Sequence, residues 1–144
     1  MEDSIYKFRG KTKISKLWVD GSLVIHEGKT FIVSKGAISG ESLIGGLIEV
    51  MPESVGQLVG QRNKSNTQIY EGDIVKWTNN FGQKIIGWVR YVRKFTGFYV
   101  LLIKGGCVSF YRLGERNFVW SELEIVGNRT ENPVMLEYAY WKSR

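Results

Sequence analysis

The chain has 144 residues, 43% hydrophobic and 24% charged, with a formal net charge of +6. This composition fits one globular domain or two small ones and excludes a disordered protein. The single cysteine, Cys107, cannot form an internal disulfide, the acidic start lacks the pattern of a secretory signal, and the longest apolar run, Phe98 to Ile103, is too short to span a bilayer. We therefore expect a cytoplasmic protein with no membrane segment.

The first 56 residues predict a β subdomain. Alternating or apolar runs that indicate strands lie at 5–8, 17–19, 23–25, 29–33 and 47–51. Asp20-Gly21-Ser22 predicts a hairpin between the second and third runs, and Glu27-Gly28 predicts a further turn. Four glycines and three serines within residues 34–46 predict a mobile loop there.

Residues 57–144 predict an antiparallel meander that ends in a short helix. Runs that indicate strands lie at 74–78, 83–94, 98–104, 107–113 and 124–126, and their close spacing is typical of a closed or nearly closed small barrel. Asn132-Pro133 is a good helix start, because Asn can serve as the N-cap and Pro as the first helical residue.

The dipeptide Gly105-Gly106 predicts a two-residue hairpin turn with a defined register. This register places Lys104 opposite Cys107 and Tyr99 opposite Arg112. We expect the face with Tyr99, Leu101, Ile103, Val108 and Phe110 to be core. The opposite face, which includes Val100 and Leu102, is expected to be mixed and partly solvated.

The net charge comes from the second part of the chain. Residues 1–56 carry seven basic and seven acidic side chains, whereas residues 76–116 carry eight basic ones against Glu115 alone. Such asymmetry favours polyanions or acidic surfaces as partners and is no argument about the fold.

Three ordered blocks of the sequence resemble the YopX family, whose members are mostly encoded by bacteriophages and prophages. The central block contains Val55-Gly56-Gln57, Gly60 and Ile69-Tyr70-Glu71-Gly72-Asp73-Ile74-Val75. The N-terminal block is Lys7-Phe8-Arg9-Gly10, and the C-terminal block is Ile125-Val126-Gly127-Asn128 with Glu131-Asn132-Pro133. Val59, Asn63 and Asn66 depart from the usual pattern, but Asn tolerates the same turn geometry, so the fold inference is unchanged.

The resemblance implies a mainly β fold in two parts. We expect residues 1–56 to form an N-terminal β subdomain and residues 57–144 to form a small SH3-like barrel with a short C-terminal helix. We expect the two parts to fold as one cooperative unit. The resemblance also implies a phage or prophage gene product in a bacterial cytoplasm. It implies no biochemical activity.

Glu71 and Asp73 are the one pair of carboxylates that a catalytic or metal-binding hypothesis can use. They lie two residues apart, so an extended chain places them on one face. The alternative is structural, because Asp beside Gly is ordinary turn chemistry and both carboxylates can accept backbone N–H groups at the Gly72 corner. We favour the structural interpretation.

Other catalytic parts are missing from the sequence. His26 is the single histidine, so no metal site with several histidines can form, and no motif pairs it with Cys107. We therefore expect a protein that is not an enzyme and that has no metal and no cofactor.

The functional lead is the basic, aromatic-rich segment 76–116. Its densest cluster is the predicted binding patch, which consists of Trp88, Arg90, Tyr91, Arg93 and Lys94. Cations that contact phosphate and rings that stack on bases are typical of nucleic-acid-binding barrels. Aromatic residues in the core, together with cations on exposed strand faces and edges, would produce the same composition. We therefore favour an interaction module that binds a protein partner or itself, with nucleic-acid binding as the alternative.

Overall fold

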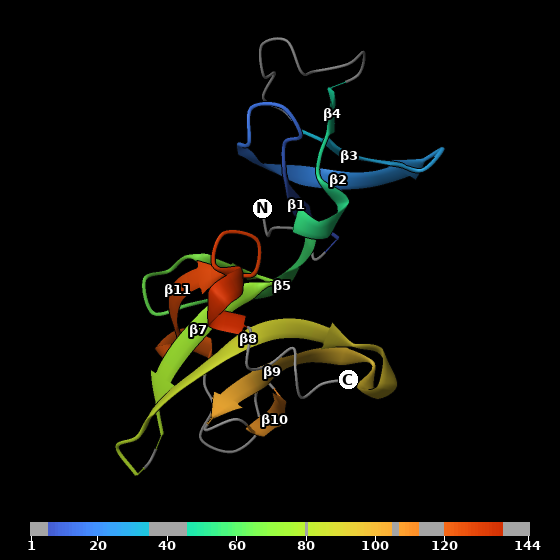
Figure 1. Ribbon diagram of the computed structural model, residues 1–144. Helices are drawn as coiled ribbons and strands as arrows, with labels where there is room; N and C mark the ends of the chain where they lie inside the picture. The colour runs from blue at the N-terminus through green and yellow to red at the C-terminus, as the bar shows by residue number, and fades with distance from the viewer. Residues whose placement is uncertain (1–5, 35–45, 80, 105–106, 113–119, 137–144) are drawn as a thin grey trace. The chain divides into compact units, whose positions relative to one another are not determined.

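Antiparallel β-strands make up most of the regular structure. The computed structural model describes residues 6–34, 46–79, 81–104, 107–112 and 120–136 (Figure 1). The chain divides into two compact units, Met1–Leu58 and Val59–Arg144. In the described part of the chain, the helical segments are 3-10 turns of three or four residues. The prediction of a mainly β fold is confirmed.

The first unit is an antiparallel sheet. Its strands are β1 (Phe8–Lys11), β2 (Trp18–His26), β3 (Lys29–Val33), β4 (Leu47–Glu49) and the first half of β5 (Gly56–Arg62), and the turn η1 (Pro52–Ser54) precedes β5. They hydrogen-bond in the order β4-β3-β2-β1-β5. The core cluster of this unit consists of Val19, Ile32, Ile48 and Val50, with Phe8, Leu23 and Val55 packed against it.

The predicted hairpin at Asp20-Gly21-Ser22 is wrong, because β2 runs straight through these residues. Gly21 lies beside β3, and a Cβ atom on it would lie 1.9 Å from the Val33 carbonyl oxygen. Gly inside a strand often marks such a close approach of another backbone. The predicted turn at Glu27-Gly28 is confirmed, since both residues have positive φ (49° and 75°) and His26 pairs with Lys29.

The second unit contains a five-stranded antiparallel sheet. After the end of β5 and its neighbour β6 (Gln68–Tyr70), the elements are β7 (Asp73–Thr78), β8 (Lys84–Val92), η2 (Arg93–Phe95), β9 (Gly97–Lys104), β10 (Cys107–Arg112), η3 (Trp120–Glu122), β11 (Glu124–Asn128) and η4 (Pro133–Leu136). The strand order is β10-β9-β8-β7-β11 (Figure 1). The meander is confirmed. No pairing among the described residues joins β10 to β11, so these strands form an open sheet rather than a closed barrel.

The register predicted for the β9–β10 hairpin is confirmed, with Lys104 opposite Cys107 and Tyr99 opposite Arg112. The core position predicted for Leu101 is confirmed, whereas the partly solvated face predicted for Val100 and Leu102 is wrong. Val100 and Leu102 are 0% and 4% exposed and belong to the core. Leu101, on the opposite face, is also buried, at 1% exposure. The hairpin alone could not decide between two apolar faces; the neighbouring strand β8 decides, because Val89 pairs with Val100 on the core side.

Two predicted segments fall largely outside the described residues. These are the loop over 34–46, of which 35–45 are not described, and the C-terminal helix beyond Leu136. A 3-10 turn begins at the predicted helix start, Pro133, where the Met135 N–H donates to the Asn132 carbonyl (3.1 Å). No helix in the described part of the chain has the length and hydrophobicity that a membrane span requires.

Candidate interaction site

The sequence blocks that carry the family resemblance contact one another within each unit. In the first unit, the N-terminal block lies on β1 and pairs with the start of β5. Phe8 is opposite Gln57, Arg9 is opposite Gly56, and the Leu58 N–H donates to the Lys7 carbonyl (2.8 Å). These residues are therefore occupied in joining two strands.

The Glu71-Gly72-Asp73 corner uses both of its carboxylates on backbone N–H groups. Asp73 is buried, and its Oδ2 accepts the Tyr70 N–H at 2.8 Å. Glu71 Oε2 accepts the Tyr91 N–H at 3.1 Å. Gly72 has φ +95°, in the region that favours glycine. The geometry is that of a structural corner. Each carboxylate accepts a backbone N–H, Asp73 from Tyr70 beside the corner and Glu71 from Tyr91 on β8.

The same corner joins β8 to the C-terminal block. The Gly72 N–H donates to the Val89 carbonyl (2.7 Å), and the Gly72 carbonyl accepts the Arg129 N–H (2.8 Å). Asn128 on β11 is opposite Asp73 on β7. The three family blocks thus join strands within each unit. A binding surface is therefore to be sought on the residues that these blocks position.

Beyond Trp88, strands β8 and β9 continue as a hairpin arm, which we define as residues 90–99. The β7–β8 pairing ends at Ile74 and Trp88, whereas β8 pairs with β9 as far as Val92 and Gly97 (Figure 1). A two-stranded ribbon is marginally stable by itself. The Glu71 carboxylate at the Tyr91 N–H therefore fixes the base of the arm on the side that β7 leaves open.

The arm divides the predicted binding patch between two faces. Trp88 and Arg90 lie on one face of β8, with the Arg90 guanidinium 5.6 Å from the centre of the Trp88 ring. Tyr91 lies on the other face, where its ring meets Phe98 edge-on at 5.4 Å. The structure thus does not bring all five predicted residues together.

Two aromatic residues outside the predicted patch complete the Arg90 side. Tyr99 is opposite Arg90 on β9 and contacts the Phe95 ring (centroids 5.3 Å apart), and Lys94 Nζ lies 5.7 Å from the centre of that ring. We call Trp88, Arg90, Lys94, Phe95 and Tyr99 the cation–aromatic face. The sequence prediction missed this pairing, because a turn at Phe95-Thr96-Gly97 would place Arg90 opposite Leu102. The observed turn begins two residues earlier, with Val92 opposite Gly97, and so pairs Arg90 with Tyr99. Arg93 lies in the turn and is exposed.

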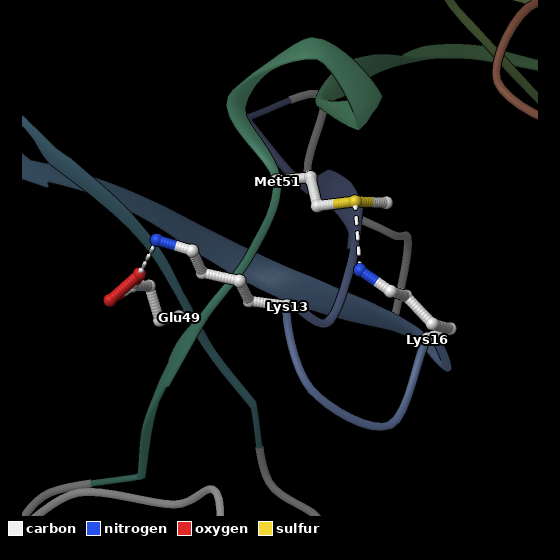
Figure 2. A network of polar contacts seen from close by, with 4 residues as sticks. All are labelled: Lys13, Lys16, Glu49 and Met51. Carbon is white, nitrogen blue, oxygen red and sulfur yellow. Dashed lines mark hydrogen bonds and ion pairs between the residues drawn. The ribbon is translucent and has the colours of Figure 1, made fainter.

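The arm cations have no acidic partner within the described part of the chain. Arg90, Arg93 and Lys94 are exposed and form no ion pair there. The first unit differs. There, Lys13 Nζ lies 3.0 Å from the Glu49 carboxylate, and Lys16 Nζ lies 3.5 Å from Met51 Sδ (Figure 2). Near the arm, Lys76 pairs with Glu124 at 3.5 Å. Within the described residues, the charges of the three arm cations are thus not neutralised by an ion pair.

In the described part of the chain, no group of three or more His, Cys, Asp or Glu residues is placed to hold a metal ion. The arm itself presents exposed cations and aromatic rings, which suit recognition by charge and aromatic contact. Exposed rings strengthen this interpretation, since Tyr91 and Phe95 are 37% and 47% exposed.

Comparison with known proteins identifies a family and a fold. The model of the YopX protein family matches residues 7–137. Among solved structures, the chain is similar to the crystal structure of protein EF1440 from Enterococcus faecalis, with a TM-score of 0.52, 18% sequence identity, and coverage of 93% of this chain and 100% of that chain. A likeness at this identity shows the fold alone. No curated protein gave a significant match.

Proposed function

The chain belongs to the YopX protein family, and we propose that it is a non-enzymatic phage or prophage accessory protein that works in the bacterial cytoplasm and binds a protein partner or itself. Its binding site is the hairpin arm. The observation that carries this proposal is the set of three exposed cations without an acidic partner in the described structure, placed beside exposed rings on an anchored hairpin.

An SH3-like barrel remains part of the proposal. The order β10-β9-β8-β7-β11 supports it, because β11, which follows the four-strand meander β7–β10 in the chain, returns to pair with β7, as in a partly open small barrel. Barrels of this kind are scaffolds whose functions reside in grafted surfaces. The scaffold therefore leaves the choice of partner to surfaces such as the arm.

Partner capture tests the proposed function. Wild-type protein immobilised in a lysate of the bacterial host is expected to retain one dominant protein, or to form a dimer by light scattering. The double variant Arg90→Ala/Lys94→Ala removes two exposed cations and is expected to reduce retention about tenfold, since two rim contacts act together. Lys29→Ala, an exposed cation of the first unit, is the matched control and should retain the partner. A blank capture together with a monomer in solution contradicts the proposal.

Nucleic-acid binding is the second candidate, favoured by the same three exposed cations, which form no ion pair among the described residues. Fluorescence anisotropy with labelled single- and double-stranded DNA and RNA at two salt concentrations tests it. Phosphate binding has to weaken steeply as salt rises. Arg93→Ala and Lys94→Ala are expected to lower affinity with little change in stability, because both side chains are exposed. No binding at low salt rejects this candidate, and equal affinity in both variants moves the site elsewhere.

A further inference from the structure

We infer that the cation–aromatic face takes an extended acidic segment of a partner protein, in which acidic residues stand two positions before and two positions after an apolar one, so that all three side chains point to one side. This inference rests on the proposed function and names the chemistry of its partner. The side chains of this face follow one another in a row of neighbours. Arg90 lies beside Trp88 and opposite Tyr99, Tyr99 contacts Phe95, and Lys94 lies over Phe95.

Two cations therefore flank a pair of rings. The Tyr99 and Phe95 rings lie 5.3 Å apart; Arg90 is the cross-strand partner of Tyr99, and Lys94 lies 5.7 Å from the centre of the Phe95 ring. A complementary chain places an apolar side chain on the rings and a carboxylate toward each cation. Arg90 can hold a carboxylate through two parallel hydrogen bonds, whereas Lys94 acts as a point charge.

The charges around the arm agree with an anionic segment. Glu71 is the described acidic side chain that contacts the arm, and its Oε2 is hydrogen-bonded to the Tyr91 N–H. Arg93 adds a third exposed cation at the turn. Because the described cations outnumber that acid, the arm attracts anions and disfavours basic segments.

The arrangement of the rings favours protein over single-stranded nucleic acid. Stacking of a planar base requires a whole free ring face, whereas an aliphatic side chain packs on any exposed part of a ring. Here Arg90 lies over Trp88 and Lys94 over Phe95, while Tyr91 and Phe98 meet edge to face. Cations that rest against rings have lost part of their rotamer freedom before binding, so ordering them around carboxylates costs less. The geometry therefore matches carboxylate recognition better than base stacking.

The test is anisotropy with three labelled probes of similar length. The first is a ten-residue peptide that repeats Glu-Ser-Leu-Ser, the second replaces every Glu by Gln, and the third is a single-stranded oligothymidylate. At low salt the Glu peptide is expected to bind about tenfold more tightly than the Gln peptide, as charge complementarity requires. The oligothymidylate is expected to bind more weakly than the Glu peptide.

Variants assign the binding to the face. Arg90→Ala and Lys94→Ala are each expected to weaken the Glu peptide about two- to fivefold, the range for one exposed charge pair. Arg90→Lys should weaken it as well, because Lys cannot form the bidentate contact. Lys29→Ala should leave it unchanged. Circular dichroism spectra that match the wild type show that each variant is folded.

Several outcomes overturn the inference. The first is equal binding of the Gln peptide, and the second is absence of Glu-peptide binding at about 1 mM. Tighter oligothymidylate binding with a steep salt dependence assigns the face to nucleic acid instead. A host protein whose capture requires Arg90 and Lys94 but is not competed by the Glu peptide leaves the proposed function standing while the inference fails.

Discussion

Replacing Gly87 by alanine is expected to destabilise the second unit by about 2–3 kcal/mol, the cost of overpacking a core. A Cβ atom at this position would lie 2.3 Å from Val100 Cγ1 and 2.8 Å from the Leu101 carbonyl oxygen. Neither neighbour can move easily. Val100 is fully buried in the core, and the Leu101 carbonyl belongs to the backbone of β9.

Gly97→Ala is the matched control, since both glycines lie in the β8–β9 hairpin. A Cβ atom on Gly97 would meet its nearest neighbour, a Tyr99 ring carbon, at 3.6 Å, an ordinary contact. Its free energy of unfolding is expected to stay within about 1 kcal/mol of wild type. Urea unfolding followed by the intrinsic fluorescence of the five tryptophans, which include the buried Trp77, measures both variants. Equal stability of the two would show that β9 yields to the extra methyl group.

Predictions from local turn chemistry agreed with the structure where the turn alone determines the register. Gly105-Gly106 predicted that Lys104 and Cys107 are opposite each other, and this pairing is confirmed. Glu27-Gly28 likewise predicted a turn that is present. In both cases neighbouring residues carry all of the information, because a short hairpin loop sets the strand pairing that follows it.

Predictions failed where a distant strand decides. The sequence around Gly21 predicted a turn, but β3 passes this residue too closely to leave room for a side chain. The core side of β9 depends on β8, which places Val89 against Val100. Local composition cannot predict such contacts. The same residues are compatible with a turn or a continuous strand at Gly21, and with either face of β9 as the core side.

The predicted binding patch illustrates the same limit. Sequence proximity grouped Arg90 with Tyr91, but neighbouring residues in a strand point to opposite faces. Cross-strand pairing groups Arg90 with Tyr99 instead. Charge composition locates the basic segment in the sequence, because composition does not depend on strand register. Which residues share one surface does depend on the register.

The largest effect at the family signature is expected for Asp73→Ala, at about 3 kcal/mol of unfolding free energy, the upper end for a lost charged acceptor that leaves a buried donor unsatisfied. The substitution leaves the Tyr70 N–H without the carboxylate that accepts it at 2.8 Å. Asp73→Asn keeps an oxygen acceptor, so its loss should be about 1 kcal/mol. Urea unfolding measures both variants. A loss below about 0.5 kcal/mol for Asp73→Ala would contradict a structural role for this carboxylate.

The two kinds of variant separate structure from recognition. If the signature is structural, Asp73→Ala should lower stability while the folded fraction binds as wild type does. Arg90→Ala should weaken binding without changing stability, because its side chain is exposed. Binding titrations corrected for the folded fraction distinguish the two effects. A folded Asp73→Ala protein that no longer binds would place the recognition chemistry at the corner, whereas retained binding places it on the arm that the corner positions.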